Sequence, residues 1–229
     1  MNTTKTEAIV LRRVNYGDSD KIINAITADM GKVSFFAKGV RKQKSKLAGG
    51  LELLSICEVS LLEGRRDMYT LISARIKEHY SNIVKDLDRT KIAYRILQVL
   101  DKSTEDDVGP EYYNLTFKSL SYLNNQKIHP AVVEAWFLVN LLAQLGMELN
   151  TEFNSKGEKL PASEKYGFEY DDMCFNENQA SEYTDKHVKL IRLYGQLSPA
   201  KIMKIDDIEE LNIPVVVLLG NIQQLLHRK

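Results

Sequence analysis

The hydrophobic pattern of this chain changes period once, near residue 80, and this change limits the folds open to it. Before that point, apolar residues form short runs rich in β-branched and aromatic side chains, which is typical of strands. From Ser81 onward they recur at helical spacing. With 229 residues, the chain is long enough for a sizeable core in each part. We therefore expect an α+β multidomain protein, with one domain over residues 1–80 and a helical domain over residues 81–229.

Five strands are expected in the first domain. They are predicted at Thr6–Val14, Lys21–Thr27, Lys32–Ala37, Leu53–Leu62 and Met68–Ile76. The turn at Asp29-Met30-Gly31 is typical of a hairpin, because glycine adopts positive φ without steric cost. Five strands of this size can close into a small barrel. We favour the OB-fold, the five-stranded barrel that holds oligonucleotides, although an SH3-like barrel has a similar pattern.

The second domain is predicted to be all helical, apart from one insertion. Its helices are expected at Asp86–Leu100, Glu111–Leu123, Ala131–Leu145, Tyr183–Tyr194 and Ile213–Leu226. Pro130 and Pro214 suit the first turns of the third and fifth helices. The third helix is apolar nearly all round and should form the buried centre. A polar stretch at about 148–182 holds two apolar islands, so we expect an inserted hairpin or subdomain there.

Charge is distributed unevenly along the chain, although the formal net charge is zero. Residues 1–80 carry 14 Lys or Arg and 9 Asp or Glu, so this part has a balance of +5 and the remainder −5. A basic N-terminal part followed by an acidic remainder suggests that the N-terminal part binds a polyanion. The polar start indicates no signal peptide, and no apolar run is long enough for a bilayer. Only Cys57 and Cys174 are present, which fits a reducing cytoplasm.

The segment Lys38–Gly50 is the main candidate nucleic-acid contact. Its first nine residues include five basic side chains and no acid, and the glycines let backbone amides approach phosphate closely. Tyr16, Phe35 and Phe36 are candidate stacking platforms, although one of the two phenylalanines must face the core because adjacent strand residues point oppositely. The residues predicted to contact DNA phosphates are Arg12, Arg13, Lys32, Lys38, Arg41, Lys42, Lys44 and Lys46. Arg65 and Arg66, on another turn, lie in the same domain.

No pattern typical of an enzyme is present, and we expect neither catalysis nor a cofactor. Asp18 and Asp20 suggest a metal pair, but a turn in which their side chains bind backbone amides fits better. The four histidines are widely spaced and are expected at the surface or at helix caps: His79, His129, His187 and His227. Lys186, Lys189 and Arg192 recur at helical spacing. They either bind an acidic peptide tail or form a solvated helix face.

Several spaced segments of the first domain also resemble a known family. They are Glu7-Ala8-Ile9-Val10-Leu11, Tyr16-Gly17-Asp18-Ser19-Asp20-Lys21, Thr27–Gly31, Ala37-Lys38-Gly39-Val40-Arg41 and Ser45-Lys46-Leu47. Together they resemble the start of RecO, a family of bacterial recombination mediators. The resemblance covers about the first 80 residues, and the helical remainder matches in layout, including the insertion.

This resemblance implies an N-terminal OB domain and a helical C-terminal domain. It also implies binding to single- and double-stranded DNA and annealing of complementary strands. The partners it implies are RecR, in some members RecF, and single-stranded DNA-binding protein, with which the protein helps to load RecA during recombinational repair. Such a protein acts in the cytoplasm, associated with the nucleoid.

One departure from the family concerns zinc. Many members carry two C-x-x-C pairs in the insertion, which bind zinc through four thiolates. Residues 150–175 of this chain contain only Cys174 and no histidine. Because thiolates are the ligands needed, we expect a zinc-less insertion. Its expected apolar contacts are Phe153, Tyr166, Phe168 and Phe175.

Two other functions fit the same residues. In the first, the barrel is an adaptor that mainly binds protein partners, and the basic loop docks on an acidic surface. In the second, the OB-fold binds RNA. An annealing assay separates the adaptor from a DNA-binding protein, and a preference for RNA over DNA of the same sequence would identify the RNA-binding factor.

Overall fold

The computed structural model describes residues 2–45, 47–64, 68–104 and 109–226. The chain forms two compact units, Met1–Asn124 and Asn125–Lys229. We expected a domain boundary after residue 80. At that point the structure changes from strands to helices, but the division between the two units comes after Asn124. The first unit extends beyond residue 80, because helices up to residue 124 pack with the strands.

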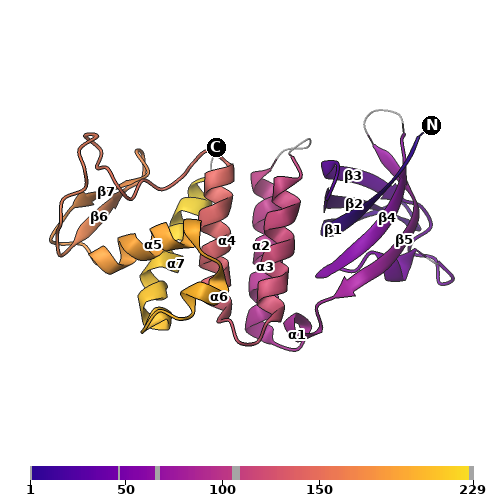
Figure 1. The fold of residues 1–229 in the computed structure, drawn as a ribbon. Coiled ribbons are helices and arrows are strands. Elements are labelled where there is room, and N and C mark those ends of the chain that lie inside the picture. Colours follow the sequence, from indigo (N-terminus) through magenta and orange to yellow (C-terminus); the bar gives the residue numbers. More distant parts are fainter. Residues whose placement is uncertain (1, 46, 65–67, 105–108, 227–229) are drawn as a thin grey trace. The chain divides into compact units, whose positions relative to one another are not determined.

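The first unit contains a closed five-stranded barrel with the strand order β1-β2-β3-β5-β4 (Figure 1). Its strands are β1 (Thr3–Tyr16), β2 (Asp20–Thr27), β3 (Gly31–Ala37), β4 (Ser55–Leu62) and β5 (Tyr69–His79). Neighbouring strands are antiparallel except for β3 and β5, which close the barrel through two parallel pairs, Phe35 with Tyr69 and Phe36 with Thr70. Gly31 takes the positive φ expected for the hairpin turn. The predicted OB-fold is confirmed.

Helices α2 (Leu87–Ser103) and α3 (Glu111–Asn124) pack on the outside of this barrel. Ile9 and Ile26 are paired across β1 and β2 and lie outside the barrel's interior cluster, yet both are fully buried. The helices therefore cover the outer face of β1 and β2 around Ile9 and Ile26. Burying two isoleucine side chains contributes about 3 to 6 kcal/mol, so this docking is part of what stabilises the barrel.

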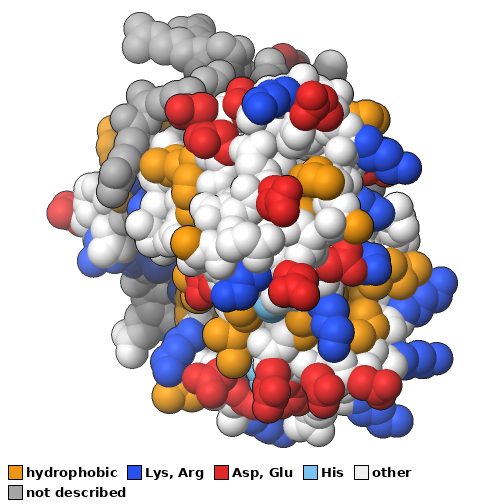
Figure 2. Space-filling model, turned by 90° about the vertical axis from the view of Figure 1, so that its left-hand side faces the viewer, with side chains coloured by type: hydrophobic (Ala, Val, Ile, Leu, Met, Phe, Trp, Pro, Cys, Tyr) orange, Lys and Arg blue, Asp and Glu red, His pale blue; other side chains and the backbone are white. Residues whose placement is uncertain are grey.

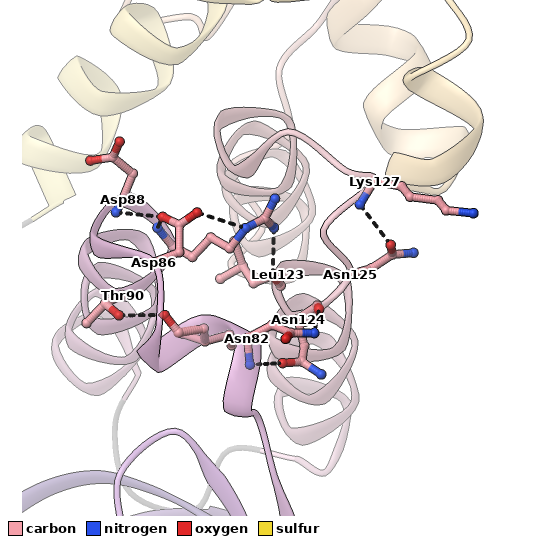
Figure 3. A network of polar contacts seen from close by, with 10 residues as sticks. Asn82, Asp86, Asp88, Thr90, Leu123, Asn124, Asn125 and Lys127 are labelled. Carbon is pink, nitrogen blue, oxygen red and sulfur yellow. Dashed lines mark hydrogen bonds and ion pairs between the residues drawn. The ribbon is translucent and has the colours of Figure 1, made fainter.

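A polar network joins the ends of these helices to the short helix α1 (Ser81–Val84), as Figure 3 shows. Asp86, at which this helix was expected to begin, caps α2 and accepts hydrogen bonds from the amides of Asp88 and Arg89. The buried Arg89 guanidinium donates to the carbonyl of Leu123 at 2.7 Å, at the end of α3. A cation is favourable at a helix C-terminus, where carbonyl groups lack intrahelical partners.

The second unit consists of helices around α4 (Pro130–Gln144). Ten of the fifteen α4 residues are buried and Pro130 occupies its first turn, so both predictions for this helix are confirmed. Gly146, with φ of 73°, follows it. The other helices are α5 (Asp185–Gln196), α6 (Pro199–Ile202) and α7 (Ile208–Leu226). None of the helices within the described residues is long and apolar enough to span a membrane.

Helix α7 begins earlier than predicted. Pro214 was expected in its first turn, but the helix starts at Ile208 and the proline lies inside it. The Leu211 amide already donates to the Asp207 carbonyl, which closes a first turn before the proline. Since proline has no N–H, the cost at this position is one intrahelical hydrogen bond.

The insertion contains a two-stranded hairpin, β6 (Tyr166–Glu169) and β7 (Cys174–Glu177), formed by the two predicted apolar islands. Tyr166 and Phe175 are buried, and the Phe168 ring lies 5.0 Å from that of Phe175. Phe153 was expected to join them but is exposed, so that part of the prediction is wrong.

Candidate nucleic-acid interface

The outer face of β1, β2 and β3 is covered by helices at one end and open at the other. At the open end lie Val14, Tyr16, Ile22 and Phe36, which we call the apolar strip. Val14 is 41% exposed and Tyr16 53% exposed, and the rings of Tyr16 and Phe36 are 5.4 Å apart. Phe35, by contrast, is fully buried inside the barrel. The expectation that one of the two phenylalanines faces the core is confirmed.

The segment Lys38–Gly50, which we call the basic loop, connects β3 to β4 beside this strip. Val40 belongs to the barrel's core cluster, as does Leu51 directly after the loop. Gly50 lies so close to the backbone of Ala74 on β5 that no Cβ atom would fit. The loop is therefore held at both ends, and less conformational entropy is lost when it binds a ligand.

The β1–β2 turn also holds the basic loop. The Gly39 amide donates to Oδ1 of Asp20 at 2.7 Å, and the Arg41 amide donates to the Ser19 carbonyl at 2.9 Å. The bond from Gly39 is the main cause that lowers the pKa of Asp20, although desolvation opposes it. Asp20 thus binds a backbone amide, as we expected, and we call this contact the Asp20 clip.

Four predicted phosphate contacts are presented on the basic loop: Lys38, Arg41, Lys42 and Lys44 are all exposed. None of them forms an ion pair with another residue in the described part of the chain. Arg41 donates one hydrogen bond to the Gly17 carbonyl, which leaves other donors of its guanidinium available. Lys46, Arg65 and Arg66 lie outside the described residues.

Arg12 and Arg13 point to opposite faces of β1, because successive side chains on a strand alternate. A bulge between Val10 and Arg12 shifts the register just before them. Arg13 donates to the Leu51 carbonyl and lies 3.4 Å from Glu52, so it supports the segment after the basic loop. Arg12 lies on the outer face, where its Nε is 2.9 Å from Oδ2 of Asp101 on α2. Its side chain is still 58% exposed.

Lys32 does not fit its predicted role as a phosphate contact. It is only 7% exposed, and its ammonium donates to the carbonyls of Asp101 and Thr104, both at 2.7 Å. The same Nζ is 3.4 Å from Oδ1 of Asp101. The reason is its register: Lys32 pairs with Ile26 on the part of the sheet that the helices cover. It is a structural cation at the C-terminal end of α2.

The three predicted partner-binding residues lie on α5 in the second unit. Lys186 is exposed, Lys189 pairs with Asp185 at 2.6 Å, and Arg192 donates to the Thr151 carbonyl at 2.6 Å. Arg192 borders two cavities, of about 500 and 370 Å³, that Phe153 also lines. On the side where Figure 1 draws β6 and β7, basic and acidic side chains are interspersed (Figure 2).

The described residues contain no group of three or more His, Cys, Asp or Glu side chains placed to hold a metal ion. Cys174 is buried on β7, and one thiol does not supply the four thiolates that zinc takes in the family. His79 is exposed, and His187 forms a capping box with Thr184. His129 precedes α4, and His227 lies outside the described residues.

Comparison with known proteins gives two family matches. Residues 1–80 match the family described as "Recombination protein O N terminal", and residues 84–210 match "Recombination protein O C terminal". The chain belongs to the RecO family. Together the two matches cover both the barrel and most of the helical part, in agreement with the resemblance seen in the first 80 residues.

Relatives of known name agree with this membership. The chain is 35% identical over 143 residues to "DNA repair protein RecO" of Dehalococcoides mccartyi, a match covering 62% of this chain and 56% of the relative. It is 34% identical over 147 residues to the protein of that name from Acetivibrio thermocellus, covering 64% and 58%. It is 33% identical over 144 residues to the protein of that name from Listeria monocytogenes, a match covering 62% of this chain and 56% of the relative. The chain thus spans little more than half the length of these relatives.

Proposed function

We propose that this protein is a RecO-type recombination mediator that binds single- and double-stranded DNA and catalyses no reaction. The observation that carries the proposal is the position of the apolar strip beside the basic loop. Aromatic side chains such as Tyr16 stack on bases, and lysine and arginine neutralise phosphates. Both kinds of contact are offered on one exposed surface at the open end of the barrel.

The proposed activity is annealing of complementary strands without ATP. Cations on the basic loop reduce the repulsion between two phosphate backbones, so that strands held close together can pair. Because the Asp20 clip and Val40 fix the loop backbone, only the side chains that carry the charges have to be ordered on binding. In recombinational repair, this would help RecA to load onto DNA coated with single-stranded DNA-binding protein, in the cytoplasm and at the nucleoid.

The salt dependence of DNA binding tests the proposal. Each single-strand phosphate contact contributes a slope of about 0.7 log units of affinity per log unit of salt. We expect Arg41→Ala, Lys42→Ala and Lys44→Ala together to reduce the slope by about two, and to slow annealing of two complementary oligonucleotides. As a matched control, removing the exposed cations Lys156, Lys159 and Lys165 of the insertion should leave the slope unchanged. An unchanged slope in the first variant would place the site elsewhere.

The same assay addresses the two other functions. An adaptor that does not contact DNA would fail to accelerate annealing at any salt concentration. An RNA-binding factor would bind RNA more tightly than DNA of the same sequence. Repeating the assay with RecR, and then with RecF, tests the proposed protein partners.

We also propose α5 as the contact for single-stranded DNA-binding protein. Lys186, Lys189 and Arg192 would pair with an acidic peptide tail, and the cavities beside Phe153 would receive its terminal apolar side chain. Lys186→Glu with Lys189→Glu should weaken binding of such a peptide at least tenfold, because like charges repel. Lys201→Glu on α6 is the control. If the double variant bound the peptide as tightly as the Lys201→Glu control does, α5 would be excluded as the contact.

A further inference from the structure

A cavity of about 450 Å³ lies between β1 and α2, outside both the apolar strip and the basic loop. Its lining includes Leu11 and Arg12 from β1, and Tyr94, Leu97 and Lys102 from α2. Tyr94 is 47% exposed and has no hydrogen bond or ring contact with another described residue. The cavity, which we call the β1–α2 groove, therefore combines an unpartnered aromatic ring with cations.

The β1–α2 groove continues the line of the apolar strip. Arg12, Val14 and Tyr16 point to the same outer face, because side chains two residues apart on a strand share a face. Arg12 and Tyr16 are four residue steps apart along the strand, a distance of about 13 Å. A chain molecule lying on Tyr16 and following β1 would thus reach the groove.

Arg12 has donors available despite its ion pair. Its Nε faces Asp101, and no hydrogen bond joins its Nη atoms to another described residue. A guanidinium has five N–H donors in a planar fork, so it can hold a carboxylate and a phosphate at once. The Asp101 carboxylate also pairs with Lys32, which offsets the repulsion it would exert on a phosphate.

We propose that the β1–α2 groove is a second segment of the single-strand path, where a base stacks on Tyr94 and Arg12 binds an adjoining phosphate. This inference rests on the proposed function, and it specifies single-stranded nucleic acid as the ligand of the β1–α2 groove. Lys102, exposed at the rim, adds a further cation. An acidic protein segment would use the cations but would not need the exposed ring of Tyr94.

The test uses oligothymidylates of about 4 and about 16 nucleotides, the limits of the site sizes of single OB-folds. Fluorescence anisotropy measures their affinity for the whole chain and for Tyr94→Ala, Tyr94→Leu and Tyr94→Phe. Leu87→Ala is the matched control, because Leu87 is 69% exposed on the same helix but does not line the groove. A 16-mer without bases, consisting of sugar and phosphate only, separates stacking from charge.

We expect Tyr94→Ala and Tyr94→Leu to weaken binding of the 16-mer roughly tenfold, within the range for loss of one stacked base. Binding of the 4-mer and of the 16-mer without bases should not change. Tyr94→Phe and Leu87→Ala should both bind like the unmodified chain. If both Tyr94→Ala and Tyr94→Leu bind the 16-mer normally, the groove is not on the path.

Two further results would overturn the inference. An equal loss for the 16-mer without bases would show that Tyr94 does not stack on a base. Weaker binding of a polyglutamate peptide after Arg12→Ala with Lys102→Ala, with oligonucleotide binding unchanged, would assign the groove to an acidic protein. Failure of the proposed function is a separate result, because the unmodified chain would then bind neither oligonucleotide.

Discussion

Lys32 shows how register decides what a basic residue does. It lies in the basic part of the sequence, but its partners Asp101 and Thr104 are 69 and 72 residues away and meet it only in the folded chain. Its charge is buried and bound by oxygen atoms of α2. Removing one member of a buried pair leaves the other charge without compensation, which is strongly destabilising.

We predict that Lys32→Met lowers the free energy of unfolding by about 2 to 4 kcal/mol, less than a full buried-pair loss because Arg12 still faces Asp101. Chemical denaturation measures this change. The exposed Lys38→Met is the matched control, and its stability should stay within about 0.5 kcal/mol of the unmodified chain. Where the protein is folded, Lys32→Met should keep the salt slope of DNA binding. A reduced salt slope in Lys32→Met would show that Lys32 does contact a phosphate.

Asp20 gives a prediction about pH. Its pKa is lowered in the folded chain, chiefly by the bond from the Gly39 amide, so its contribution to stability is present above the ordinary value of 3.8. That contribution is lost as pH falls through the lowered value, where the carboxylate is protonated. We expect the Asp20 clip to persist from neutral pH to about pH 4 and to weaken below it.

Two measurements check this pH dependence. An NMR titration should place the Asp20 carboxyl pKa below 3.8, and the Gly39 amide resonance should shift with the same midpoint. In Asp20→Asn the Gly39 resonance should lose that transition. A Gly39 amide that titrates identically in both proteins would mean that the clip does not form in solution.

At the scale of elements, the strands and most helices could be predicted because local patterns determine them. Apolar runs rich in β-branched and aromatic residues, together with turn chemistry, located the five strands, and Asp86 marked the start of α2. The start of α7 was missed because the preference of proline for a first turn is only statistical, and Pro214 lies inside the helix.

The site was predictable only in part. The charges of the basic loop are contiguous in the sequence. The contacts of Lys32 and Arg12 with α2 depend on tertiary packing. A signal for that packing was present: Ala8-Ile9-Val10-Leu11 is apolar without alternation, which is typical of a strand buried on both faces. This run indicates that helices cover the barrel.

The position of the basic loop against β5 depends on Gly50. An added Cβ would collide with the backbone of Ala74, whereas nothing lies within 4 Å of a Cβ at Gly49. We predict that Gly50→Ala destabilises the protein by about 1 to 3 kcal/mol and that Gly49→Ala changes it by less than about 0.5 kcal/mol. Thermal unfolding of the two variants compares them directly. Equal melting temperatures would show that the loop does not approach β5 this closely.

At the scale of the whole molecule, the first unit joins parts that the sequence pattern separates. The barrel residues Ile9 and Ile26 are buried under helices, and Glu7 accepts a hydrogen bond from the Tyr113 hydroxyl of α3 at 2.9 Å. Lys77 also pairs with Glu7, and it is the main cause that lowers the pKa of that carboxyl. These contacts make α2 and α3 part of the barrel's stable unit.

We therefore predict that residues 1–124 fold alone, whereas residues 1–80 do not form a stable barrel. The longer fragment retains the partners of Lys32, Glu7 and Ile9, and the shorter one exposes Ile9 and Ile26 to water. Calorimetry should show one cooperative transition for 1–124 and none for 1–80. Because the apolar strip, the basic loop and the β1–α2 groove all lie within residues 1–124, this fragment should bind the 16-mer with the salt slope of the whole chain. A stable, cooperatively unfolding fragment of residues 1–80 would show instead that the barrel does not depend on its helical cover.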